Sequence, residues 1–474
     1  MSLNISDQSS WEKEQRFLTI ERKRYPEQFF LEKKSPEILL NRIGINEKMN
    51  KRPKGYVKYS PLDFIVEEIA LDGTVIDIGD SNLPRIEDGI GTVYTDLVKV
   101  GISTLDAVAR ISSALEIDPK RIGYAGIKDA GALTGQRISI RGLEKERIEG
   151  LKLPNLILKN ISIGKSVMNI GDLAGNRFTL FIRTEHKLNT EDFSLIIEKL
   201  KNEGVMNYYG IQRFGAPRFL AHLFGAYLLQ GDSEGLIRTY FTKASPFEWL
   251  YVGNLRKQFE QNFGNWKLMR QIADQLPHTF RFERAMLDVL ESDSSLNKYP
   301  KAITSIPLQA DLWVKAYASF LANKVLSSFV LSEQKPPENI PLLLGFDPSI
   351  AEFYKDFLKQ DGTQDFLKNL QNFPFIHIGR LSSIPSVIRP NIHNYKIVDE
   401  GLAISFDLPK AAYATTVLGS LFETQSDLPM PEWAKRREYD VKEILNLGSC
   451  SEAKNQLKIY IELAMNLKNS FGEE

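Results

Sequence analysis

A change of pattern along the chain constrains the fold more than any single motif. The run at residues 176–184 alternates apolar and polar side chains, as expected of a strand with one buried face. From about residue 218 to 385, apolar residues recur instead at spacings of three and four, most clearly at residues 311–331. Alternation resumes at residues 401–409. The pattern predicts an α+β fold in which a helical block is inserted between two parts of one sheet-containing domain.

The length indicates more than one domain, because a single hydrophobic core rarely organises 474 residues. The N-terminal segment is set apart because it is highly charged and periodic only in patches. We expect five segments: an N-terminal extension at 1–50, the first part of the core at 51–217, the insertion at 218–385, the return segment of the core at 386–430 and a C-terminal helical tail at 431–474.

Composition is that of an ordinary globular protein, with 43% hydrophobic and 25% charged residues. The chain contains no run of about 18 apolar residues that would predict a membrane span, and its N-terminus lacks the apolar core of a secretory signal. Cys450 is the single cysteine, which excludes an intramolecular disulfide framework and indicates a reducing compartment. We therefore expect a cytoplasmic protein without a membrane segment.

Charge is distributed unevenly, although the formal net charge is zero. Residues 1–58 carry 13 Lys+Arg against 8 Asp+Glu, and residues 48–58 hold five basic residues and no acidic one. Such a cluster is either a solvated linker or a contact for a phosphate backbone. The sequence alone leaves both interpretations open.

Signals for metals and organic cofactors are missing from the sequence. The single cysteine has no partner nearby, and no phosphate-binding loop, dinucleotide fingerprint or nucleophile elbow is present. We therefore expect neither a metal site nor a cofactor. The chain has five histidines, and none of them falls at the spacing of metal ligands: His186, His222, His278, His377 and His393.

Residues 123–140, GYAGIKDAGALTGQRISI, predict a strand, a loop and a second strand, with Lys128 and Asp129 in the loop. A carboxylate at this place can serve as a nucleophile or a general base, and a cation beside it would keep it ionised. The alternative is an aspartate that caps a turn.

Two further stretches combine rings with cations. Residues 207–219, NYYGIQRFGAPRF, suit base stacking and phosphate contact or, alternatively, aromatic packing in a turn. In residues 58–68, KYSPLDFIVEE, Lys58 and Phe64 offer a charge and a ring, although alone this stretch predicts only a strand.

Together the three stretches resemble the motifs of the TruD family of tRNA pseudouridine synthases. The family patterns P-x-D-F-x-V-x-E, G-x-K-D-x-x-A-x-T-x-Q and N-Y-[FY]-G-x-Q-R-F-G appear in the same order as PLDFIVEE (61–68), GIKDAGALTGQ (126–136) and NYYGIQRFG (207–215). The resemblance covers about residues 52–430. It implies a pseudouridine synthase core, a mixed and mainly antiparallel sheet flanked by helices, with a mostly helical TRUD insertion domain.

The resemblance also implies an activity: isomerisation of uridine to pseudouridine, with uridine-13 of tRNA as the typical target. It implies no metal or organic cofactor, and a monomer. Asp129 falls at the catalytic position and would act on the ribose, either by attack on C1′ or by removal of the C2′ proton. Tyr209 matches the ring that stacks on the target base, a position often held by Phe.

The remaining matched residues are expected to bind substrate or to shape the site. Lys58 and Phe64 match positions that line it, and Asn207 either orders the loop that carries Asp129 or contacts the base. Lys128 either favours the ionised form of Asp129 or forms a structural salt bridge elsewhere, because adjacent side chains on an extended chain point to opposite faces.

RNA binding by a neutral chain would need a local basic cleft, which we expect residues 48–58, Arg137, Arg213 and Arg218 to form. The alternative function is an RNA-binding or RNA-chaperone protein that kept the fold and lost the reaction. A hydrolase with Asp129 as base would want a second carboxylate or a metal, and the sequence signals neither.

Overall fold

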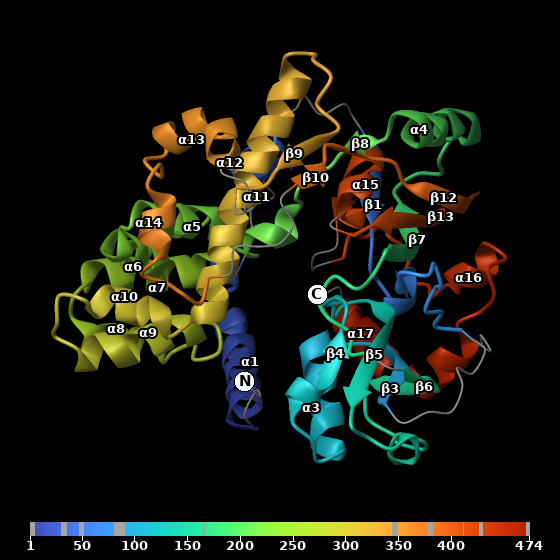
Figure 1. The fold of residues 1–474 in the computed structure, drawn as a ribbon, viewed down its shortest axis with the longest axis horizontal. Coiled ribbons are helices and arrows are strands. Elements are labelled where there is room, and N and C mark those ends of the chain that lie inside the picture. Colours follow the sequence, from blue (N-terminus) through green and yellow to red (C-terminus); the bar gives the residue numbers. More distant parts are fainter. Residues whose placement is uncertain are drawn as a thin grey trace. The chain divides into compact units, whose positions relative to one another are not determined.

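The computed structural model describes residues 5–29, 36–46, 52–79, 91–164, 166–343, 349–376, 383–410, 412–425 and 430–470. The chain forms two compact units, which we name by their contents. The sheet unit consists of residues 50–205 and 387–474, and the helical unit of residues 1–49 and 206–386. Figure 1 labels many of their strands and helices.

A mixed sheet is the centre of the sheet unit. Its main path runs β12-β13-β7-β2-β5-β3-β6, and neighbours on this path are antiparallel except for β2 and β5, which are parallel. β1 pairs with β7 and β14, and β4 pairs with β5. The strands are β1 Lys54–Tyr56, β2 Phe64–Ile69, β3 Thr92–Lys99, β4 Ile122–Tyr124, β5 Leu133–Arg141, β6 Leu156–Gly164, β7 Gly175–Thr184, β12 Asn391–Val398, β13 Gly401–Pro409 and β14 Glu423–Gln425.

Helices cover both faces of this sheet. On β7, Phe178, Leu180 and Ile182 pack in one core with residues of α4 and α15, which confirms the alternation predicted at 176–184. Ile65 on the neighbouring strand β2 faces the other side and packs with residues of α17. The helices are α3 Thr104–Ala114, α4 Thr190–Glu203, α15 Ala414–Leu421, α16 Val441–Ile444 and α17 Ser451–Ser470.

Three carboxylates at β2 are buried, which explains the acidic letters of the PLDFIVEE stretch. Burying a charge is costly unless the charge is paired, so each carboxylate needs a cation within the core. The pairs are Asp63 with Arg183 at 2.5 Å, Glu67 with Lys442 at 2.5 Å and Glu68 with Lys128 at 2.9 Å.

The helical unit is built around α11 (Pro307–Leu331), which contains the periodic run predicted at 311–331. The N-terminal helices α1 and α2 belong to this unit, where the Glu14 carboxylate accepts hydrogen bonds from the backbone N–H groups of His278 (2.6 Å) and Thr279 (3.1 Å). The short strand β9 (Asn339–Pro341) pairs with β10 (Ser383–Pro385). The other helices are α1 Ile5–Arg24, α2 Pro36–Arg42, α5 Ala221–Gln230, α6 Ser233–Thr242, α7 Leu250–Gln261, α8 Trp266–Ala273, α9 Arg281–Ser292, α10 Lys298–Thr304, α12 Ser349–Phe353, α13 Lys355–Gln360 and α14 Phe366–Leu370.

The fold class expected from the sequence is confirmed: a mixed, mainly antiparallel sheet flanked by helices, with a helical block between its two parts. The chain leaves the sheet unit at β8 (Val205–Met206) and returns to it at β11 (Val387–Ile388). The NYYGIQRFG stretch therefore lies in the helical unit, whereas α16 and α17 of the C-terminal segment lie in the sheet unit. No helix within the described ranges is both long and apolar enough to cross a membrane.

Candidate active site

Asp129 lies in the loop that connects β4 to β5. Because β5 pairs with β2, β3 and β4, this loop leaves the sheet and returns to it at fixed points. Gly135, near the start of β5, is required by close packing, since a Cβ there would lie 2.4 Å from the carbonyl oxygen of Ile76. The strand, loop and strand predicted at residues 123–140 are confirmed.

The Asp129 carboxylate has a donor on each oxygen. Oδ1 accepts a hydrogen bond from the backbone N–H of Gly131 at 3.0 Å, and Oδ2 accepts one from the Lys58 ammonium. Burial tends to raise the pKa of Asp129, but the Lys58 ammonium, the Gly131 N–H and the Lys99 charge hold it below its ordinary value. The side chain is nevertheless 49% exposed. It is therefore an ionised, oriented and accessible carboxylate, which is what a nucleophile or general base requires.

Lys58 and Phe64 bring the first motif to this carboxylate. Lys58 has a φ of 63°, a left-handed conformation that costs a side-chain-bearing residue about 1–3 kcal/mol and is common at functional sites. Its Nζ lies 4.3 Å from the centre of the Phe64 ring. Phe64 is buried, and the face of its ring forms a cation–π contact with the ammonium. The structure thus brings together Lys58, Phe64 and Asp129 as the sequence predicts.

Lys128 faces away from Asp129. Its Nζ lies 2.9 Å from the Glu68 carboxylate and 2.5 Å from the Asn176 side-chain oxygen, and its side chain is 5% exposed. Burial raises the pKa of Glu68, and the Lys128 ammonium opposes that rise. Of the two alternatives that the sequence left open for Lys128, the geometry is that of the structural salt bridge.

Lys99 forms hydrogen bonds to the backbone of the Asp129 loop. No sequence pattern indicated this role. It is the last residue of β3 and is fully buried. Its ammonium donates hydrogen bonds to the backbone carbonyls of Ile102 (2.9 Å), Lys128 (3.3 Å) and Asp129 (3.0 Å). The loop is thus fixed to the adjacent strand by a charged donor.

Thr104 and Gln136, both fully buried, form a second support for the same loop. The Thr104 hydroxyl accepts a hydrogen bond from the Lys128 N–H (2.9 Å) and donates one to the Gln136 side-chain oxygen (2.8 Å). The Gln136 amide in turn donates to the carbonyl of Gly126 (3.1 Å). This relay gives a physical reason for the final Gln of the GIKDAGALTGQ stretch.

Asn207 anchors a segment of the helical unit. Its backbone N–H donates to the carbonyl of Ser386 (2.9 Å), and its side-chain amide donates to the carbonyl of Pro385 (2.9 Å). The side chain is 2% exposed. The hydrogen bonds of this amide are those of a loop anchor within the helical unit.

Tyr209, also in the helical unit, has its backbone gripped by one buried side chain of α11. The Asn323 oxygen accepts a hydrogen bond from the Tyr209 N–H (2.8 Å), and the Asn323 amide donates to the Tyr209 carbonyl (3.0 Å) and to the Ile43 carbonyl (2.9 Å). Tyr209 is 6% exposed, and the Arg213 guanidinium carbon lies 5.5 Å from the centre of its ring. Asn323 had no signal in the sequence, because a polar residue inside a helix ordinarily faces water.

The residues expected to form a basic cleft are divided between the two units, and the cleft stays a prediction. Arg218 is buried and donates to the carbonyls of Tyr240 (3.0 Å) and Lys243 (2.6 Å), so the prediction that it contacts phosphate is wrong. Arg137 pairs with the buried Asp96 at 2.9 Å within the sheet. Residues 48–51 of the basic stretch lie outside the described residues.

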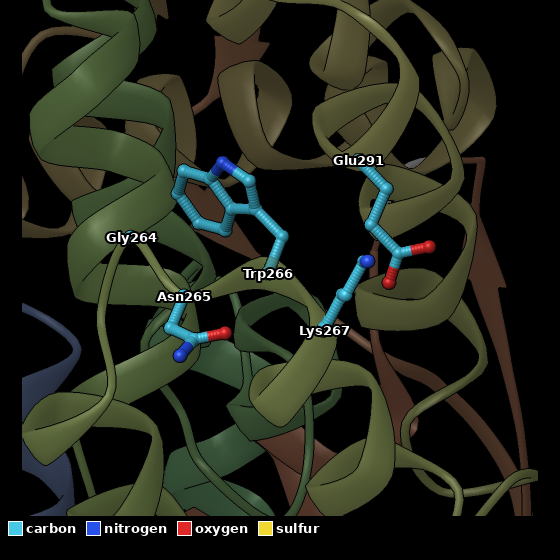
Figure 2. A pocket seen from close by; sticks show the side chains of 5 residues that line it. All are labelled: Gly264, Asn265, Trp266, Lys267 and Glu291. Atoms are coloured by element: carbon cyan, nitrogen blue, oxygen red, sulfur yellow. The ribbon is translucent and has the colours of Figure 1, made fainter.

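No group of three or more His, Cys, Asp or Glu side chains within the described ranges is arranged to hold a metal ion, and His377 lies outside those ranges. Figure 2 shows a pocket of about 490 Å³ in the helical unit, with the Trp266 ring on one side and the Lys267 and Glu291 side chains on the other. Its other lining residues are Gly264 and Asn265, so it contains none of the predicted site residues.

Comparisons with known proteins point to one family. Residues 47–336 match the family model of tRNA pseudouridine synthase D (TruD). The chain is 27% identical over 383 residues to the probable tRNA pseudouridine synthase D 1 of Methanocaldococcus jannaschii, covering 78% of this chain and 95% of that protein. It is 29% identical over 377 residues to the probable tRNA pseudouridine synthase D of Methanococcus vannielii, covering 77% of this chain and 94% of that protein.

A solved structure has the same fold. It is the crystal structure of the putative tRNA pseudouridine synthase D from Methanosarcina mazei, which matches with a TM-score of 0.61 and 23% sequence identity. The match covers 82% of this chain and 99% of that chain.

Proposed function

Because the chain belongs to the TruD family of tRNA pseudouridine synthases, which are isomerases, we propose that it converts a uridine of tRNA to pseudouridine, with uridine-13 as the target. The observation that carries this proposal is the Asp129 carboxylate, which is ionised, held by Lys58 and Gly131, and half exposed. Substrate and product are isomers, so the reaction consumes no oxidant, reductant or group donor.

The proposed reaction begins with removal of the uridine from its base stack, which costs a few kcal/mol. The C1′–N1 bond then breaks and its electron pair moves to the uracil. The uracil turns, C5 forms a bond to C1′, the C5 proton is lost and N1 is protonated. Asp129 either attacks C1′ as N1 leaves, forming a glycosyl ester that breaks when C5 bonds to C1′, or removes the C2′ proton to give a glycal and returns that proton to C2′ when C5 bonds to C1′.

Lys58 has a defined part in either route. Once Asp129 bonds to the ribose or takes up a proton, its carboxylate no longer carries the charge that Lys58 neutralises. The ammonium can then stabilise the uracil anion, and the Phe64 ring beneath it limits where that charge can move.

The helical unit supplies the proposed base contact and corresponds, on this proposal, to the insertion domain of the family. Tyr209 is proposed to stack on the target base, a contact worth about 1–3 kcal/mol. Since Tyr209 is 6% exposed, stacking requires that the side chains that cover it move when tRNA binds. Asn207 is proposed to keep residues 385–386 in place beside this loop.

The test uses unmodified tRNA transcripts that carry uridine or cytidine at position 13. Each is incubated with the wild-type protein and with Asp129→Asn, and pseudouridine is mapped by carbodiimide-dependent stops of reverse transcription. We expect one new stop, at position 13, with wild type and uridine-13 only. A stop elsewhere would reject the target, and tRNA binding without any stop would favour the RNA-binding alternative.

A further inference from the structure

Lys99 is a lysine that is buried at the end of β3, where an apolar side chain would ordinarily be expected. Lysines ordinarily keep their charge in water, yet this side chain is fully buried. Among the described residues no ion pair includes it, in contrast to Lys442, which is 3% exposed and contacts Glu67 (2.5 Å) and Asp77 (2.8 Å). Its hydrogen bonds go instead to three backbone carbonyls.

Two of those carbonyls flank one Cα atom. The Lys128 carbonyl belongs to the peptide plane before Cα of Asp129, and the Asp129 carbonyl belongs to the plane after it. Because peptide units are planar, fixing both planes fixes φ and ψ of residue 129 and with them the direction of its Cα–Cβ bond. The N–H of Gly101 reinforces this by donating to the carbonyl of Ala130 at 3.0 Å.

We propose that Lys99 is a positioning residue for the isomerisation: its buried ammonium fixes the two peptide planes around Asp129 and so aims the carboxylate at the ribose. The inference rests on the function proposed above.

Keeping this charge in the sheet costs free energy. Burial lowers the pKa of Lys99 to about 8, and the Lys128 ammonium lowers it further. The carboxylates of Asp129 and Asp106 act in the opposite direction. An apolar side chain would avoid that cost but would leave the loop carbonyls without their donor.

The test compares Lys99→Met with Lys442→Met, two variants that each remove a buried ammonium from the sheet unit. Single-turnover rates are measured by carbodiimide mapping of pseudouridine, and tRNA affinity by filter binding. Thermal unfolding measures the stability of each variant. For Lys99→Met we expect the rate to fall about 100-fold with affinity within twofold of wild type, because a small misplacement of a reacting group is enough for such a loss. For Lys442→Met we expect a lower melting temperature and a rate within threefold of wild type.

Lys99→Gln, which replaces the three donors of the ammonium by the two N–H donors of a neutral amide, should have an intermediate rate, and it carries the test alone if Lys99→Met does not fold. A folded Lys99→Met, or failing that a folded Lys99→Gln, with a wild-type rate overturns the proposal. Inactive wild-type protein overturns the underlying function instead, so the two failures are distinguishable.

Discussion

The loop of Asp129 and the loop of Tyr209 are held in similar ways by chemically different side chains. Each has its backbone gripped from an adjacent element by one fully buried residue, Lys99 for the first and Asn323 for the second. The first grip is an ammonium that donates only, and it adds positive charge beside a carboxylate. The second is a neutral amide that donates and accepts, and it adds no charge beside a ring proposed to stack on a neutral base.

The two grips also differ in what else they hold. Lys99 connects parts of the sheet unit that are close in sequence to the loop or paired with it. Asn323 also donates to the carbonyl of Ile43, so it ties the N-terminal segment to the Tyr209 loop. From this difference we expect changes near Asp129 to act on the rate of reaction, and changes near Tyr209 to act on tRNA affinity.

The largest effect within this comparison is expected for Lys58→Met. Loss of the ammonium should lower the single-turnover rate about 100-fold, by analogy with removal of one charge-stabilising donor. It should also raise the pKa of Asp129, because Lys58 is the principal group that lowers it. Activity that depends on ionised Asp129 is lost as pH falls through that pKa, so the loss should begin at a higher pH in the variant.

A pH–rate profile from pH 3 to 7 checks this prediction, because the wild-type pKa of Asp129 lies below 3.8. Lys187→Met is the matched control, since Lys187 is an exposed lysine of the sheet unit that pairs with Asp399 at the surface. Its profile should overlay that of wild type. An unshifted acid limb in Lys58→Met would contradict the proposed control of Asp129.

A smaller effect, on affinity, is expected for Tyr209→Leu. Loss of a stacked ring should weaken tRNA binding about tenfold, which corresponds to about 1.4 kcal/mol. Tyr209→Phe is the matched control and should bind within twofold of wild type. Filter-binding titrations measure the tRNA affinity of both variants. Equal affinity of the leucine and phenylalanine variants would show that Tyr209 does not stack on the base.

A few-fold loss of affinity is expected for Asn323→Leu, which removes the grip on the Tyr209 backbone without touching its ring. The saturated single-turnover rate should stay within twofold of wild type. Ser319→Ala is the matched control, because Ser319 is a buried polar residue of α11 whose hydroxyl donates to the carbonyl of Lys315 in the same helix. A lower saturated rate with unchanged affinity would contradict the division of roles between the two loops.

The smallest effect on turnover is expected for Lys128→Met, despite its place beside Asp129. Its loss leaves the Glu68 carboxylate buried without its cation, which should destabilise the fold by about 3–5 kcal/mol. Denaturant unfolding should show this loss of stability. The double variant Lys128→Met with Glu68→Gln should recover part of the lost stability. A rate per folded molecule more than tenfold below wild type would instead place Lys128 in the reaction.

The sequence predicted those parts of the molecule that local patterns determine. Alternation at residues 176–184 predicted β7, and helical spacing at 311–331 predicted α11, because each pattern reports which face is buried. The motif residues Lys58 and Asp129 were predicted to share a site, and the structure joins them.

The rest depends on partners that are distant in the sequence. Lys99 and Asn323 are polar residues whose burial is decided by the carbonyls that surround them, so no local pattern distinguishes them from surface residues. Arg218 was expected to bind phosphate from its neighbours in the sequence, but the carbonyls of Tyr240 and Lys243 hold it inside the helical unit.

The most direct test of the central role of Asp129 is a single-turnover reaction of Asp129→Asn at saturating tRNA, with tRNA affinity measured on the same preparation. We expect affinity within twofold of wild type and no detectable pseudouridine at position 13. Product formation within tenfold of the wild-type rate would contradict it.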